Sequence, residues 1–116
     1  MNVIKLERDD QDCLFNPNGE TPVLRNIRGL RECLLPDRRS KDGGEVFSSE
    51  VGMEVEMWAY RHLNSAGIVP LGDVDVYYDF REAGFVGSGS GRQVRFVYQM
   101  YISEEGHNQV CGLNKK

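Results

Sequence analysis

His107 and Cys111, near the end of the chain, are the first pair of residues whose types could support a reaction. A histidine in contact with a cysteine can hold it as a thiolate, which is the nucleophile of cysteine-dependent enzymes. The segment around them offers no acid at a spacing that would orient the imidazole, and glycines flank it on both sides. We therefore predict no nucleophilic catalysis here.

A glycine-rich stretch over 84–91 follows a segment of strand character, as a phosphate-binding loop would. Such a loop needs a helix N-terminus behind it, and a P-loop ends in Gly-Lys-Ser/Thr. Neither feature is present, which favours a flexible hairpin loop. Phe85 and Val86 do not fit a purely solvated loop, so we predict that they contact a partner or fold back onto the core.

Acidic residues form a row along 73–82: Asp73, Asp75, Asp79 and Glu82. Clustered carboxylates are the ligands that Mg²⁺ prefers. On a strand, however, Asp75 and Asp79 would lie about 13 Å apart, too far to share one ion. We predict a solvated face, with no metal and no cofactor. A small metal-dependent enzyme, or a small-molecule-binding protein with an aromatic cavity, is the third alternative for the function.

The net charge of −4 is distributed unevenly. Residues 23–44 contain six basic and three acidic residues, a net charge of +3, whereas residues 45–60 contain four acidic residues. An acidic chain is unsuited to whole-surface contact with nucleic acid, but a local patch can bind phosphates. A nucleic-acid-binding module is therefore our second alternative, and its candidate residues are Arg25, Arg28, Arg31, Arg38, Arg39 and Lys41.

Three cysteines without a Cys-x-x-Cys pair indicate neither a disulfide framework nor a zinc knuckle. The first residues turn acidic before any apolar run develops, which is unlike a signal peptide. No apolar run approaches the ~20 residues of a membrane helix. We predict a cytoplasmic protein without membrane contact, and the length of 116 residues predicts a single domain over 1–116.

Two segments of alternating polarity, 73–81 and 93–103, dominate the last third of the chain. Side chains alternate across a strand, so this period predicts an antiparallel, half-buried hairpin. Pairing about the centre of the glycine-rich loop places Phe80 opposite Val94 and Asp79 opposite Arg95. We also expect short N-terminal strands, the first near Asn2–Leu6.

Two helices should pack on this sheet, which gives an α+β fold. The first is expected over 22–35, with an apolar stripe formed by Val23, Ile27, Leu30 and Leu34. A short strand over 32–35 is the competing interpretation. The second helix is expected over 49–66, and its stripe includes Val51, Val55, Ala59 and Leu63. Alternation of polarity over 50–57 is equally typical of a strand, and we choose the helix.

The outer face of the hairpin would present an apolar stripe of Tyr77, Val97 and Tyr101. Tyrosine is enriched at protein interfaces because it buries a large area at little entropic cost. No complete catalytic set accompanies it. We therefore predict a non-catalytic binding protein, of the inhibitor, immunity or accessory type, that acts through a protein–protein surface. Its partner would be another protein or a second copy of the chain.

Overall fold

The computed structural model describes residues 2–11, 13–19, 23–37, 43–65 and 74–106. This part of the chain contains one long helix, a four-stranded mixed sheet and a small two-stranded ribbon, and it confirms the α+β fold class. Within these ranges, no helix combines the length and the apolar character needed to cross a bilayer.

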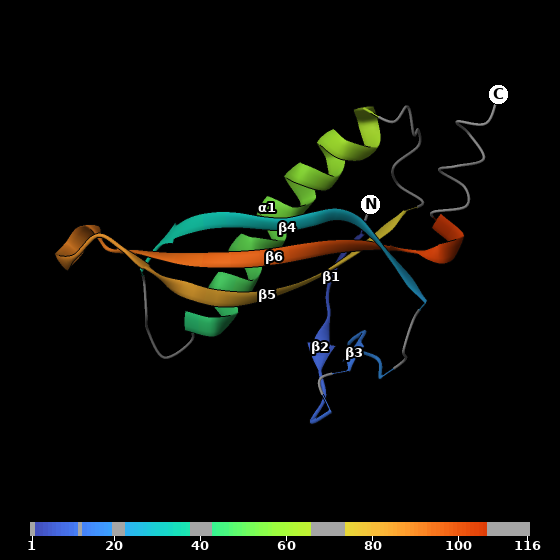
Figure 1. Cartoon of the computed structure of the whole chain (residues 1–116), viewed down its shortest axis with the longest axis horizontal. Coiled ribbons are helices and arrows are strands. Elements are labelled where there is room, and N and C mark those ends of the chain that lie inside the picture. The colour runs from blue at the N-terminus through green and yellow to red at the C-terminus, as the bar shows by residue number, and fades with distance from the viewer. Residues whose placement is uncertain (1, 12, 20–22, 38–42, 66–73, 107–116) are drawn as a thin grey trace.

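The sheet has the strand order β1-β5-β6-β4, so β4 forms one of its edges (Figure 1). β1 is parallel to β5, and the other two pairs are antiparallel. A 3-10 turn, η2 (Gly89–Gly91), links β5 to β6, and the small ribbon pairs β2 with β3. The strands are β1 (Asn2–Lys5), β2 (Glu7–Arg8), β3 (Leu14–Phe15), β4 (Leu24–Pro36), β5 (Asp75–Val86) and β6 (Gln93–Ser103).

Helix α1 (Gly43–Ser65) crosses one face of the sheet diagonally, and its C-terminal half extends past β4 (Figure 1). Every fourth residue along it is buried: Phe47, Val51, Val55, Ala59 and Leu63. This spacing places the five side chains in one stripe that faces the sheet. The helix expected over 49–66 is therefore confirmed through Ser65, and 50–57 is helical rather than extended.

The predicted alternation along 93–103 is confirmed by β6, which supplies much of the sheet's half of the core. Its even-numbered residues are each at most 1% exposed: Val94, Phe96, Tyr98, Met100 and Ile102. They pack with Val76 and Tyr78 of β5 against the α1 stripe. Burying several large apolar side chains, each favourable by about 1.5–3 kcal/mol, fixes the sheet beneath the helix.

The hairpin exists, but the predicted register is wrong by four residues. Phe80 pairs with Tyr98 rather than Val94, and Asp79 lies opposite Gln99 rather than Arg95. The reason is that β5 continues beyond Arg81 to Val86, through a register irregularity between Glu82 and Phe85. Gly84 in that irregularity has φ 120°, a conformation open to glycine. Because four is even, every side chain keeps its expected face.

The helix expected over 22–35 is instead the edge strand β4. Its pairing with β6 is interrupted twice, between Asn26 and Arg28 and between Arg28 and Arg31. Each bulge adds a residue and shifts the alternation, and this produces apolar spacings of three and four in a strand. In the expected apolar stripe, Ile27 packs against the core whereas Leu30 is 56% exposed.

Candidate protein-interaction site

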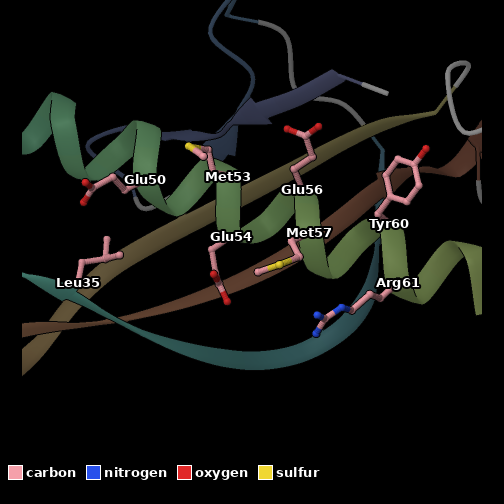
Figure 2. Close-up of a pocket in the computed structure, with 8 residues that line it drawn as sticks. All are labelled: Leu35, Glu50, Met53, Glu54, Glu56, Met57, Tyr60 and Arg61. Atoms are coloured by element: carbon pink, nitrogen blue, oxygen red, sulfur yellow. The ribbon is translucent and has the colours of Figure 1, made fainter.

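A groove of about 820 Å³ runs along the exposed side of α1 and is bordered by Leu35 of β4, while Met53, Glu56 and Tyr60 point away from β4 (Figure 2). We name it the α1–β4 groove. It combines exposed apolar side chains with carboxylates: Met53 is 70% exposed, Tyr60 53% and Met57 44%. Its lining residues are Leu35, Glu50, Met53, Glu54, Glu56, Met57, Tyr60 and Arg61.

The helix places these residues because they lie away from its buried stripe. Met53 and Met57 are one turn apart. In sequence each lies between two members of the buried stripe, so its side chain is on the opposite side of the helix. Methionine has a flexible, polarisable side chain that adapts to irregular apolar partners. Two exposed methionines and a tyrosine on one helix therefore form a surface suited to contact with another apolar chain.

The backbone of β4 beside this groove faces outward at alternate residues. The N–H of Asp37 donates to the carbonyl of Arg92 at 3.0 Å, so this pair is hydrogen-bonded across β4 and β6. Hydrogen-bonded and non-hydrogen-bonded pairs alternate along an antiparallel ladder. Leu35 and Cys33 consequently direct their backbone groups toward β6, whereas Glu32 and Leu34 direct theirs toward the open edge.

Among the strands that the structure describes, none pairs with the outer side of β4, and this open edge is regular only at its C-terminal end. Both bulges of β4 lie before Arg31, and from Arg31 to Pro36 the pairing with β6 is uninterrupted. Pro36 falls on an outward-facing position, where the missing N–H costs no ladder hydrogen bond. The stretch Arg31–Pro36 thus offers two N–H donors and several carbonyl acceptors directly beside the α1–β4 groove.

Glu54 on α1 contributes to the electrostatics of this region, and its side chain points toward β4 (Figure 2). Burial raises the pKa of the Cys33 thiol to about 11, and the Glu54 carboxylate adds to that rise. Burial and Glu54 also raise the pKa of Tyr98, while Arg31 acts to lower it. At neutral pH the Cys33 thiol is therefore protonated and is no nucleophile.

The described members of the predicted basic patch, Arg25 and Arg31, already have contacts within the chain. The Arg31 guanidinium stacks on the Trp58 ring at 3.6 Å, and Arg25 pairs with Glu104 at 3.2 Å. Arg28 belongs to β4, but its side chain is outside what the structure describes. Arg38, Arg39 and Lys41 also lie outside the described residues.

Tyr77, Val97 and Tyr101 share the face of the sheet away from α1, as expected, but the stripe is less exposed than expected. Tyr77 is only 8% exposed, between Ile4 of β1 and Tyr101 of β6. The Tyr101 hydroxyl donates to Gln99 Oε1 at 2.7 Å. Burial raises the pKa of Tyr101 to about 12, with a further contribution from the Asp79 carboxylate.

Phe85 and Val86 belong to β5 and not to a loop tip, because β5 extends to Val86. Phe85 is 47% exposed, and the Arg92 guanidinium lies 4.5 Å from the centre of its ring. The same guanidinium binds Asp37, with an Nε–Oδ2 distance of 2.8 Å. These contacts fasten the tip of the hairpin to the end of β4.

The acidic row forms no metal site in the described part of the chain. Asp75 accepts a hydrogen bond from Asn2, and Asp79 pairs with Arg8 at 3.5 Å. Among the residues that the structure describes, no three His, Cys, Asp or Glu side chains gather to hold an ion. Asp73, His107 and Cys111 lie outside those residues.

The sequence interpretation missed the α1–β4 groove. Met53 and Met57 fall within 50–57, where the alternation of polarity is equally typical of a strand. The available signal was their place on the helical wheel, opposite Val51, Val55 and Ala59. That signal alone does not identify a groove, because the second wall depends on 24–36 being a strand.

No family model, curated protein or solved structure shows a significant similarity to this chain.

Proposed function

We propose that this chain is a non-catalytic protein-binding domain that holds an extended segment of a partner protein along Arg31–Pro36 of β4, beside α1. The observation that carries the proposal is the coincidence of an open, regular strand edge with an apolar groove on the helix side. Strand addition takes its affinity from main-chain hydrogen bonds and its specificity from pockets for alternate side chains.

The two parts of the site fit one another in geometry. Leu34 and Glu32 offer outward backbone groups, and a strand paired with them would send every second side chain toward α1. Those side chains would meet Leu35 and Met57, which already line the groove. An apolar groove without an adjacent strand edge, or an edge without a groove, would give only half of this recognition mode.

The nucleic-acid alternative has weaker support. Arg31 and Arg25 already contact Trp58 and Glu104, and the groove itself carries three glutamates and one arginine. Such a surface repels phosphates more than it attracts them. We propose the α1–β4 groove in place of the outer stripe of Tyr77, Val97 and Tyr101. The burial of Tyr77 leaves little of its ring for contact with a partner.

Site-specific photo-crosslinking in the native host tests the proposal. A photo-reactive phenylalanine analogue replaces Met57 in the groove, and a matched control carries the analogue at the exposed Asn18. We expect the analogue at 57, but not that at 18, to link to one short contiguous segment of a partner. The cross-link should be lost when Leu34→Pro removes the outward N–H, and largely kept in Leu34→Ala, which retains it.

Cross-links of equal yield in the Leu34→Pro and Leu34→Ala proteins would contradict strand addition at β4. Cross-links scattered over a partner's folded surface would contradict it as well. Thermal melts of both variants, compared with the unchanged protein, separate loss of binding from loss of the fold. Pro36 already occupies an outward-facing site of β4, so proline at 34 is compatible with an edge strand.

A further inference from the structure

The chemistry of the α1–β4 groove also indicates what kind of segment fits it. Resting on the proposed function, we infer that the bound segment is an extended one whose groove-facing residues are apolar and include at least one basic side chain opposite Glu54. The inference adds a sequence preference to the proposed strand addition.

The apolar part of the preference follows from the groove walls. Side chains of an added strand that lie opposite Cys33 and Leu35 point to the same side of the sheet as those two residues, toward α1. There they would contact Leu35 and Met57, and Met57 is 44% exposed without a partner strand. Burying such apolar surface favours binding.

The basic part of the preference follows from the charges. The groove is lined by Glu50, Glu54 and Glu56 against a single Arg61. Glu54 lies near enough to Cys33 and Tyr98 to act on their ionisation, and its side chain points toward β4 (Figure 2). A lysine or arginine of an added strand would meet this carboxylate at the rim of the groove, where a charge pair strengthens selectivity.

A single strand fits this site better than a second copy of the chain. α1 already extends past β4 in the layer on one side of the sheet (Figure 1). A copy paired along the same edge would bring its own α1 into that layer. The two bulges before Arg31 also limit the regular edge to a short stretch, which suits a peptide segment.

Two synthetic probes test the inference with the full chain. Each is a seven-residue peptide with blocked ends and the sequence Thr-Leu-Thr-Xaa-Thr-Leu-Thr. The central residue Xaa is lysine in one probe and glutamate in the other. Binding is followed by the fluorescence of Trp58, the chain's single tryptophan, and by amide chemical shifts. We expect the lysine probe to bind at least about tenfold more tightly.

Variants of the chain test whether the Glu54 carboxylate causes the difference in affinity between the two probes. Glu54→Gln should reduce the lysine-to-glutamate ratio by at least about threefold while leaving the glutamate probe no weaker. Added salt should reduce the ratio in the same direction. Leu34→Pro should remove the binding of both probes, whereas Leu34→Ala should weaken them far less.

The outcomes separate the inference from the proposed function. Equal binding of both probes, or tighter binding of the glutamate probe, with loss of both in Leu34→Pro, would overturn the basic preference and leave strand addition in place. Binding of neither probe would also overturn the inference. Binding unaffected by Leu34→Pro would overturn both. A sedimentation experiment that shows a dimer dissociated by Leu34→Pro would assign the edge to a second copy and overturn the commitment to a separate segment.

Discussion

The guanidinium of Arg31 lies 3.6 Å from the centre of the Trp58 ring, which joins the edge strand β4 to α1. Arg61, which follows Trp58 by nearly one turn of α1, lies 5.8 Å from the centre of the same ring. A cation over an indole is attracted by the electron-rich face of the ring, and the aliphatic part of arginine packs beside it. The contact therefore holds the strand that forms one wall of the α1–β4 groove.

Replacing Arg31 should loosen that wall. We expect Arg31→Ala to lower the free energy of unfolding by about 1–2 kcal/mol and to shift the Trp58 emission toward longer wavelength. Arg31→Lys keeps the charge but not the planar stack, so it should recover only part of the loss. Denaturant melts of the two variants give the answer, and an Arg31→Ala protein as stable as the original would show that the stack is incidental.

The ion pair at the end of β4 should contribute more than an exposed one. The Asp37 side chain is only 8% exposed where it accepts from Arg92, while Arg25 and Glu104 are each about half exposed. We expect Asp37→Ala to cost about 2 kcal/mol, because it leaves a hydrogen-bonded charge without its acceptor. Arg25→Ala should cost less than about 0.5 kcal/mol. Similar costs in chemical denaturation would contradict this ranking.

Tyr77 should behave as a core residue and not as an interface residue. Its side chain is 8% exposed, whereas Tyr60 on α1 is 53% exposed. We expect Tyr77→Ala to destabilise the fold by about 3 kcal/mol, and Tyr60→Ala to change its stability by less than about 0.5 kcal/mol. Equilibrium unfolding measures both, and a stable Tyr77→Ala protein would restore the outer stripe as a candidate surface.

Stability should fall in alkaline solution. Burial raises the pKa of Cys33 from 9.0 to about 11 and that of Tyr101 from 10.0 to about 12. The folded state therefore holds these protons more tightly than the unfolded state. The resulting contribution to the free energy of unfolding is complete below about pH 9, and it is lost as the pH rises toward 11 for Cys33 and 12 for Tyr101. For Cys33 alone the loss reaches about 2 kcal/mol by pH 11.

Cys33→Ala isolates the thiol's part of this pH dependence. Its stability should decline less steeply above pH 9 than that of the original protein, whatever its stability at neutral pH. Cys13→Ala, at an exposed site, serves as the matched control. Parallel pH profiles for the Cys33→Ala and original proteins would contradict the assignment.

The elements that could be predicted from the sequence are those with an uninterrupted period. Val51, Val55, Ala59 and Leu63 repeat every fourth residue, and this spacing indicated α1 correctly. The alternation from Val94 to Ile102 likewise indicated β6 and the face on which each of its side chains lies. In both cases the local pattern and the tertiary packing agree.

β4 and the hairpin register could not be predicted because bulges change the period locally. Two extra residues between Asn26 and Arg31 give a strand the apolar spacing of a helix, and only pairing with β6 decides between them. An irregularity between Glu82 and Phe85 similarly hides the length of β5. The groove was missed for the same reason, since Leu35 forms its wall only when 24–36 is extended.

Amide hydrogen exchange, followed residue by residue by NMR, tests the central claim most directly. In the free protein, we expect the amides of Glu32 and Leu34 to exchange quickly and those of Cys33 and Leu35 slowly, because only the latter pair donates to β6. Adding the lysine probe should slow exchange at Glu32 and Leu34 in particular. Slow exchange at these two amides in the free protein, or no added protection when the probe is bound, would contradict strand addition at β4.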